Sequence, residues 1–400
     1  MTSGIPQLAS DLRSALKGRK IGAQRPRTAA LVSWRKPFLR VLGALVAVLI
    51  ACALFITAVD PYDNYPWGFT PKLERQRYNP RAVPWLLNTL VKSDYDTYLI
   101  GGSTVSPFVA ADIERELTGT RKAFVVGYLA PRPRDLVTVF RRIGQAKSVR
   151  RIIVAFDISY LHPPEVARRE FPFALYDDDV ANDLRAFGIQ ALRLSVRMLT
   201  GQEYHLNDWD IARDNASFED LYRRSLSPET VRSIRRKIEE YKPYVLNPSP
   251  HSCENLPAVN ALNDFARTMA ARGVRVDILI PPFSYYVYYD WLNPKRAPYR
   301  LTNAPLTTLI ASRRCLLAAL DGAPGTRVFA YDLRPEIVED MANYRDSAHI
   351  HGTELGKHML EMINRGEGLL TLATFDDYAS QLSARVKNYT YRNSKLDAGR

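Results

Sequence analysis

The chain has 400 residues, of which 46% are hydrophobic and 24% charged, and it carries a net charge of +13. This composition is typical of a folded globular protein and excludes both a disordered chain and a transporter with many membrane spans. The positive excess is concentrated in residues 1–40, which hold nine Lys and Arg and one acid, whereas the other 360 residues hold 46 basic and 41 acidic side chains. Because the body is nearly balanced, its charge does not indicate a nucleic-acid surface, and we expect no nucleic-acid partner.

An uncharged apolar segment follows this basic arm. Residues 41–59 read VLGALVAVLIACALFITAV, and a helix of 19 residues with a rise of about 1.5 Å each nearly crosses a hydrocarbon core of about 30 Å. Since the basic arm lies on one side and Asp60 and Asp63 on the other, the positive-inside rule predicts a cytoplasmic N-terminus. The sequence thus predicts a single-pass anchor in the cytoplasmic (inner) membrane, with the body outside the cytoplasm, for instance in a periplasm.

Cleavage of this segment is the alternative interpretation. Residues 51–53 (Ala-Cys-Ala) resemble a small-residue cleavage site, and residues 49–52 resemble a lipoprotein box. However, the basic arm is longer than that of a signal peptide, and the apolar run continues past both sites through Phe55 and Ile56. We therefore expect an uncleaved anchor.

The body is organised as short apolar stretches that alternate with helical patterns. We expect a stalk and entry segment over residues 60–93, one domain over 94–377 with a polar, partly helical insertion over 160–250, and a polar tail over 378–400. Helical spacing of apolar residues is found over 105–117, around 136–140, over 256–272 and around 355–363. Strand-like runs lie at 95–100, 123–126, 151–156, 274–280 and 327–331.

This alternation predicts an α/β fold, in which a mainly parallel five-stranded sheet is covered by helices on both faces. Ligands of such sheets bind beyond the carboxyl ends of the strands. That rule draws attention to Gly101-Gly102-Ser103-Thr104 after the first strand, to Gly127 after the second and to Asp157 after the third.

The strongest chemical signal joins Ser103 to a second motif near the other end of the chain. Ser103 follows two glycines at a helix entrance, where free backbone N–H groups can stabilise an oxyanion. Asp346 lies three residues before His349, close enough for the carboxylate to orient the imidazole. A weak hydroxyl nucleophile needs this combination of a base and an orienting group.

These two motifs resemble those of the SGNH hydrolase family, which is also called the GDSL family of esterases and acyltransferases. The resemblance implies a three-layer α/β/α sandwich with the strand order 2-1-3-4-5. It also implies that Ser103 is the nucleophile, His349 the general base and Asp346 its orienting partner. The chain departs from the family pattern at two places: Gly102 replaces the Asp before the serine, and the Gly-x-Asn-Asp block reads Phe-Asp-Ile-Ser over residues 156–159.

Together with the anchor, these departures resemble the membrane-anchored branch that includes the alginate O-acetylation proteins and the D-alanine transfer protein of teichoic acid modification. The resemblance implies a serine O-acyltransferase that receives an acyl group from a membrane-bound O-acyltransferase. It passes that group to a hydroxyl of a polysaccharide or another cell-envelope glycan. An esterase acting on the same class of substrate and a non-catalytic glycan-binding scaffold are the alternatives.

Further residues are candidates for the oxyanion hole or the substrate site. At the strand ends these are Gly102, Thr104, Gly127 and Asp157. Tyr285 and Tyr288 belong to an aromatic segment after the fourth strand, which we expect to border the pocket because such rings suit sugars.

The remaining cysteines and histidines give weaker signals. Cys253 and Cys315 lie outside the anchor and could form a disulfide, although their spacing does not decide it. His351 and His358 lie near His349, but no Asp, Glu or Cys cluster completes a metal site, and no nucleotide-binding motif is present. We therefore expect no metal and no cofactor.

Overall fold

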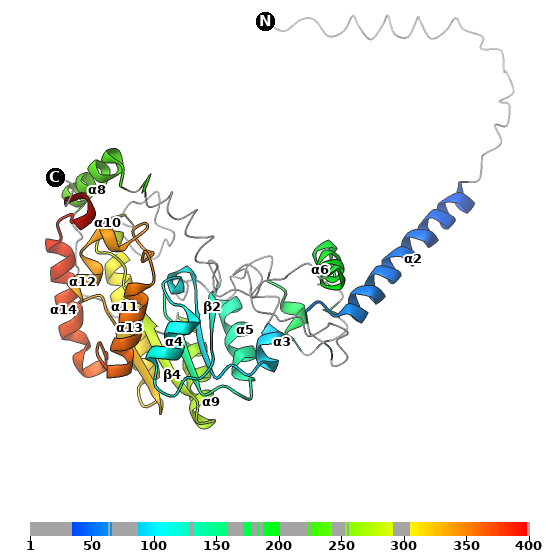
Figure 1. The fold of residues 1–400 in the computed structure, drawn as a ribbon, viewed down its shortest axis with the longest axis horizontal. Helices are drawn as coiled ribbons and strands as arrows, with labels where there is room; N and C mark the ends of the chain where they lie inside the picture. Colours follow the sequence, from blue (N-terminus) through cyan, green and yellow to red (C-terminus); the bar gives the residue numbers. More distant parts are fainter. Residues whose placement is uncertain are drawn as a thin grey trace, which may run out of the picture. The chain divides into compact units, whose positions relative to one another are not determined.

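A computed structural model describes residues 34–62, 65, 87–127, 132–157, 171–177, 179, 182–183, 187–200, 223–224, 226–241, 253, 256–290 and 305–397 (Figure 1). The chain divides into two compact units, residues 1–52 and residues 53–400. The long helix α2 (Arg35–Val59) crosses the boundary between them, and all other described elements belong to the second unit.

The second unit is built on five parallel strands in the order β2-β1-β3-β4-β5, which confirms the predicted fold class. All strands except β5, which is one of the two edge strands, are buried along nearly their whole length, because helices cover both faces of the sheet. The strands are β1 (Thr97–Gly101), β2 (Ala123–Gly127), β3 (Arg151–Ala155), β4 (Arg275–Ile280) and β5 (Thr326–Ala330).

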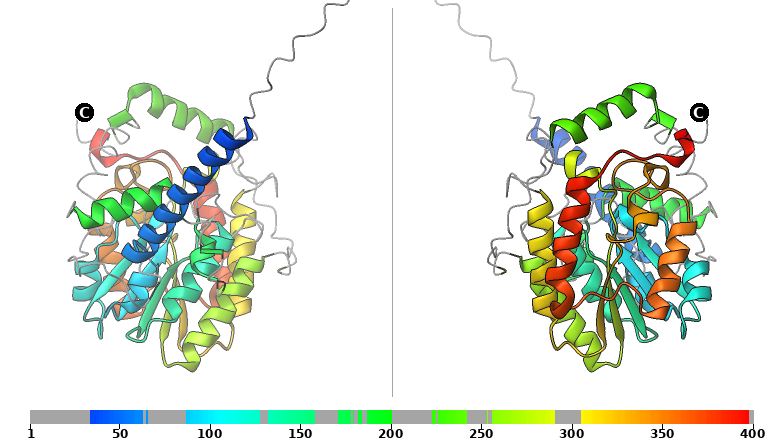
Figure 2. Two further views of the ribbon diagram at one scale, coloured as in Figure 1. Left: turned by 90° about the vertical axis from the view of Figure 1, so that its right-hand side faces the viewer. Right: turned by 90° about the vertical axis from the view of Figure 1, so that its left-hand side faces the viewer.

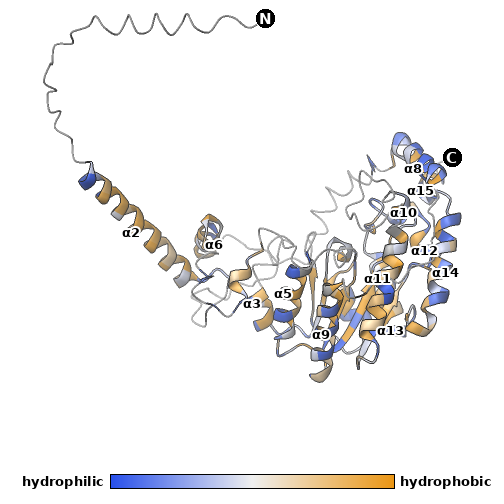
Figure 3. Cartoon of the chain, turned by 180° about the vertical axis from the view of Figure 1, so that it is seen from behind, coloured by the Kyte–Doolittle hydropathy of each residue, from blue (hydrophilic) through white to orange (hydrophobic). Residues whose placement is uncertain are grey.

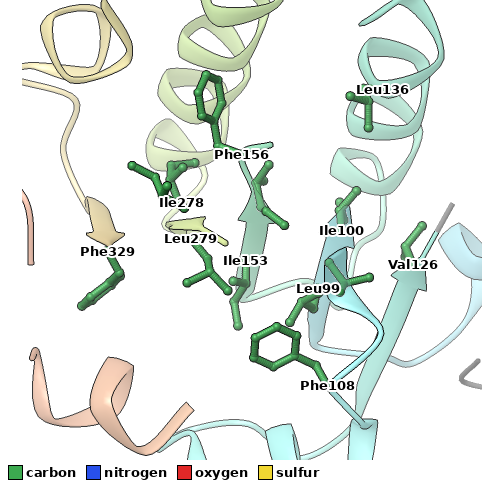
Figure 4. Packing of buried hydrophobic residues seen from close by; sticks show 14 of the residues in the cluster. Leu99, Ile100, Phe108, Val126, Leu136, Ile153, Phe156, Ile278, Leu279 and Phe329 are labelled. Carbon is green, nitrogen blue, oxygen red and sulfur yellow. The ribbon is translucent and has the colours of Figure 1, made fainter. Parts of the chain in front are cut away.

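Two helical layers enclose the sheet. In one layer α4 (Ala110–Glu116) contacts α13 (Glu354–Arg365), and in the other α9 (Pro257–Ala271) contacts both α5 (Pro133–Gly144) and α11 (Pro305–Leu320). Figure 4 shows Leu136 of α5 on one side of the strands and Phe108, just before α4, on the other. The two further views in Figure 2 show the sheet between these helices.

Shorter or peripheral elements complete the described part of the chain. Those before β4 are α3 (Leu87–Lys92), η2 (Ser103–Val105), η4 (Phe173–Leu175), α6 (Ile189–Leu199) and α8 (Pro228–Glu240). Those after β4 are α10 (Val287–Asp290), α12 (Pro335–Val338), η7 (Met341–Asn343), α14 (Leu372–Asn388) and α15 (Ser394–Asp397).

Helix α2 is the one helix in the described residues that is long and apolar enough to cross a membrane. Its 25 residues span about 37 Å, against a hydrocarbon core of about 30 Å. Figure 3 shows the helix as hydrophobic along most of its length and hydrophilic at its N-terminal end. Near its other end, Ile56 and Val59 are buried in the core of the second unit.

The predicted segments around the domain differ from the structure in three places. Residues 378–400 do not form a polar tail as far as they are described, because Tyr378, Leu382 and Val386 of α14 are buried and this helix contacts α11. The predicted helix over 105–117 is divided into η2 and α4, since Pro107 lies between them and has no N–H for a continuous helix.

The described ends of residues 60–93 pack against the domain: Tyr62 and the apolar side of α3 are buried. The insertion over 160–250 contains α6 and α8, and most of its other residues lie outside the described ranges.

A disulfide joins Cys253 to Cys315 of α11, with their Cα atoms 5.4 Å apart. This bond settles the pairing that the sequence left open. It ties α11 to the chain just before α9, within the helical layer that contains both helices.

Candidate active site

Ser103 lies in a tight turn just beyond the carboxyl end of β1. Gly102 continues in an extended conformation, and η2 begins with hydrogen bonds from Val105 N to Gly102 O (3.3 Å) and from Ser106 N to Ser103 O (3.2 Å). The preceding residue, Gly101, lies against β3 so closely that a Cβ there would be 2.7 Å from the Cβ of Ala155 and closer still to Val105. The absence of a side chain at this point therefore lets the turn lie flat on the sheet and leaves Ser103 half-exposed at its edge.

Asp346 and His349 lie in a tight hairpin-like loop that precedes α13. An antiparallel bridge between Tyr344 and Ile350 forms its base. The Arg345 N–H donates to the His349 carbonyl oxygen (2.9 Å) and closes the loop. At the tip, Asp346 Oδ1 accepts hydrogen bonds from the N–H groups of Ala348 (2.8 Å) and His349 (2.9 Å). The carboxylate is thus held by the backbone of its own loop.

The loop and the turn meet to form a continuous Ser–His–Asp arrangement. His349 Nδ1 lies 2.7 Å from Asp346 Oδ2, and His349 Nε2 lies 2.7 Å from Ser103 Oγ. An ionised carboxylate only accepts hydrogen bonds, so Nδ1 must carry the ring proton of the neutral imidazole. The lone pair on Nε2 then accepts the Ser103 hydroxyl, as a general base requires. The structure therefore brings together all three residues predicted to be catalytic.

The surroundings of the carboxylate keep it ionised. Burial alone would raise the pKa of Asp346, but the hydrogen bond and charge of the His349 ring and the two backbone N–H groups outweigh it and lower the pKa below its ordinary value of 3.8. The Asp346 side chain is 37% exposed and that of His349 24%. The site is therefore open to solvent as well as to a ligand.

Two contacts hold the turn after β1 (the serine turn, residues 102–107) against the segment that carries His349. That segment consists of the loop over residues 344–350 (the base loop) and of α13, which follows it. The buried guanidinium of Arg345 donates a hydrogen bond from Nη2 to Oγ of Ser106, three residues after the nucleophile. In addition, α13 approaches the same turn so closely that a Cβ on Gly356 would lie 2.6 Å from the carbonyl carbon of Pro107 and closer still to its oxygen. No role was predicted for these residues from the sequence. The position of Arg345 directly before Asp346 was the available signal.

The loop after β4 supports the base loop from another side. Ser284 Oγ donates to the carbonyl oxygen of Ser347 (2.6 Å), and the Tyr344 hydroxyl donates to the carbonyl oxygen of Pro282 (3.2 Å). Tyr344 and Ser284 are both buried. The segment that was expected to line a pocket thus fixes the position of the loop that carries Asp346 and His349.

Tyr285 and Tyr288 themselves differ from their predicted role. Each is about 1% exposed, so neither presents an aromatic face to a sugar. Tyr285 donates to the backbone oxygen of Asp332 (2.7 Å), and the Tyr288 hydroxyl lies 3.5 Å from its carboxylate. The oxygens of Asp332 give both buried hydroxyls a hydrogen-bond acceptor, and this allows the two rings to lie in the core.

Asp332 links the end of β5 to both neighbouring helices. Its carboxylate accepts from Arg313 Nη2 of α11 (3.1 Å) and from the Tyr378 hydroxyl of α14 (2.9 Å), and all three side chains are buried. A buried carboxylate needs such partners to offset its loss of hydration. The network fixes the start of the segment that runs from β5 to the base loop.

The other strand-end candidates lie around the serine turn. Thr104 Oγ1 donates to Asp157 Oδ2 (3.2 Å), and Gly127 pairs in register with Gly101 on the neighbouring strand. An ionised Asp157 accepts hydrogen bonds and cannot replace the amide donor of the SGNH pattern. The better oxyanion donors are the N–H groups of Ser103 and Thr104, for which the described residues offer no acceptor at this helix start.

Within the described ranges, no group of three or more His, Cys, Asp or Glu residues could hold a metal ion. No protein-family model matches the chain, and no curated protein matches it.

Proposed function

We propose that the protein is a membrane-anchored serine O-acyltransferase that modifies an exported polysaccharide or another cell-envelope glycan, with acetyl as the expected acyl group. The observation that carries the proposal is the hydrogen-bonded sequence Ser103–His349–Asp346 at the carboxyl edge of the sheet. The carboxyl edge of the sheet is also where α/β folds of this type bind their ligands.

The first half of the reaction forms an acyl-enzyme. His349 Nε2 takes the hydroxyl proton as Ser103 Oγ attacks the carbonyl carbon of the acyl donor. The N–H groups of Ser103 and Thr104 stabilise the negative charge on the carbonyl oxygen. When the bond to the donor's leaving group breaks, His349 gives the proton to that group, and Asp346 stabilises the charged ring without taking its proton.

The second half transfers the acyl group to the glycan. A sugar hydroxyl attacks the acyl carbonyl carbon and loses its proton to His349, which returns the proton to Ser103 as the acyl–serine bond breaks. A membrane-bound O-acyltransferase is the proposed donor and the polysaccharide the acceptor.

Two features support an extracytoplasmic location for this chemistry. The apolar helix α2 follows an arm that is rich in Lys and Arg, which favours a cytoplasmic N-terminus and an exported body. The Cys253–Cys315 disulfide is typical of proteins in oxidising compartments. We infer an anchor in the cytoplasmic membrane with the site on its outer side.

Hydrolysis is the second candidate activity, because the partial exposure of His349 and Asp346 gives water access to an acyl-enzyme. An esterase would release the free acid, whereas a transferase would leave the acyl group on the sugar.

The experiment replaces Ser103 in the full-length chain and measures ester-linked acyl groups on the exported polysaccharide of cells that carry only the variant. Ser103→Ala should abolish the modification, while Ser380→Ala on the exposed side of α14 should not change it. Intact-mass measurement of the purified protein with an acyl donor should show the acyl adduct in the Ser380 variant only. Unchanged acyl content with Ser103→Ala would refute the proposal, and release of free acid without transfer would favour the esterase.

A further inference from the structure

Helix α6 carries apolar residues on two sides. Its inner side, formed by Ala191, Leu194 and Met198, is buried in the domain. Its outer side exposes Ile189 (67%), Val196 (46%) and Leu199 (55%). Figure 3 shows this short helix as predominantly hydrophobic. Single exposed apolar residues are common on protein surfaces, but large apolar side chains that recur at helical spacing on one exposed face indicate an interaction surface.

The outer side of α6 also carries positive charge. Arg193 and Arg197 are both exposed, lie one helical turn apart and stand beside Val196. The helix contains no acidic residue. An apolar stripe with arginines at its border is typical of helices that lie in the interface of a lipid bilayer, where the stems pack on apolar surface and the guanidinium groups meet anionic headgroups.

The position of α6 in the second unit brings this surface close to the end of the anchor. Asp60 directly follows α2, and its Oδ2 accepts a hydrogen bond from the Tyr65 N–H (2.9 Å). The Tyr65 hydroxyl in turn donates to Oδ2 of the buried Asp183 (3.1 Å). Asp183 lies six positions before Ile189, a stretch that reaches at most about 20 Å. The first turn of α6 therefore lies within about 20 Å of Asp183, which Tyr65 links to the residue that directly follows α2.

From these observations we propose that the outer side of α6 lies in the headgroup region of the membrane, with Ile189, Val196 and Leu199 among the acyl chains and Arg193 and Arg197 on anionic phospholipid headgroups. The inference rests on the membrane-anchored placement in the proposed function. A bilayer is favoured over a protein partner, including the membrane-bound O-acyltransferase of the proposed function, because lipid surrounds the adjoining anchor and the arginines beside the apolar stripe suit anionic headgroups. With two attachments, the domain is held in a fixed orientation on the surface rather than turning freely about α2.

The test uses the full-length protein in vesicles of phosphatidylcholine with 30% phosphatidylglycerol. A Cys52→Ala background removes the free thiol, and Cys253 and Cys315 stay oxidised in their disulfide. Val196→Cys is labelled with an environment-sensitive fluorophore, and quenching is measured with lipids that carry a spin label on the acyl chain. Matched variants place the same label on the exposed side of α14 (Ser380→Cys) and within α2 (Leu49→Cys).

We expect the Val196 label to be quenched at least threefold more than the Ser380 label. The double replacement Arg193→Glu and Arg197→Glu should remove at least half of this excess, as should vesicles of phosphatidylcholine alone, while quenching at Leu49 stays unchanged.

The outcomes separate this inference from its premise. Quenching at Leu49 without quenching at Val196 overturns the α6 proposal and leaves the anchor intact. A Leu49 label that lipid does not quench overturns the anchored placement and the α6 proposal with it. Protection of Val196 in native membranes but not in lipid vesicles would assign the surface to a protein partner instead. None of these results depends on acyl transfer, which the Ser103 variant tests separately.

Discussion

The close approach of α13 to the serine turn predicts that one methyl group will separate the nucleophile from its base. In Gly356→Ala the new Cβ would lie 2.6 Å from the carbonyl carbon and 3.2 Å from the Cβ of Pro107. Carbon atoms in contact prefer about 3.5–4.0 Å, so the helix and the turn must move apart by about 1 Å. Pro107 follows Ser103 by four residues, and Gly356 follows His349 by seven. A shift of this size lengthens the 2.7 Å Ser103–His349 hydrogen bond beyond the range of a true bond.

The effects on stability and on activity should differ in size. Overpacking costs about 1–3 kcal/mol, while replacing a helical glycine by alanine contributes about 0.5–1 kcal/mol, so we expect a net loss of about 0–2.5 kcal/mol. A misplacement of about 1 Å costs on the order of 100-fold in rate, equivalent to about 2.7 kcal/mol. The variant should therefore remain folded, since a domain has about 5–15 kcal/mol of stability, while its acylation rate falls about 100-fold.

The assay compares the rate of acyl-enzyme formation, followed by intact mass, with the free energy of unfolding in urea. Gly322→Ala serves as the control, because Gly322 has a positive φ of +70° and no atom within 4 Å of a new Cβ. It precedes β5, at the opposite end of the strands from the site. It should lose about 1 kcal/mol of stability and no activity. If Gly356→Ala forms the acyl-enzyme at the native rate, whatever its free energy of unfolding, the contact does not position the triad.

Three further predictions concern the base loop. Asp346→Asn should lower the acylation rate by about 10³–10⁴-fold, because the amide would donate to Nδ1 and leave the proton on Nε2 facing Ser103; a loss below tenfold in single-turnover kinetics would contradict this role. Arg345→Met, which removes the hydrogen bond to Ser106, should lower kcat by about 10–100-fold with little change in KM, whereas an equal rise in KM alone would point to substrate binding. Since folding lowers the pKa of Asp346 from 3.8, its stabilisation is fully present above that pH and is lost as the pH falls through the folded pKa. In urea unfolding, Asp346→Asn should therefore be less stable than the native protein by about 1 kcal/mol at neutral pH, the worth of one hydrogen bond, and the difference should shrink as the pH falls below 3.8; a constant difference would count against the assignment.

The fold was predictable because each strand has a sequence pattern that can be recognised without knowing its neighbours. Each strand is a short apolar run flanked by glycines or turns, and burial on both faces removes the polar alternation that would suggest an open sheet. Parallel strands place their carboxyl ends at one edge. A serine after β1 and an imidazole in the segment after β5 could therefore be paired from the sequence alone.

The parts that sequence did not reveal depend on distant partners. Tyr285 lies in the core because its hydroxyl donates a hydrogen bond to the backbone oxygen of Asp332, which is 47 positions away in the chain. Helix α14 was missed for another reason. Phe375, Leu382 and Val386 have helical spacing, but the many polar residues on the opposite side dominate the composition of the segment. The Gly356–Pro107 approach has no local sequence signal, because it depends on where α13 lies against the turn.

The two halves of the site are 246 positions apart in the chain, and this separation has a consequence for biosynthesis. A chain that is synthesised from its N-terminus presents Ser103 long before His349 has left the ribosome. Until the loop before α13 has emerged and docked, Ser103 is an ordinary alcohol with no base. A polypeptide that is truncated or stalled before residue 349 therefore lacks the base, and under the proposed function acylation of Ser103 would report that the domain has been completed.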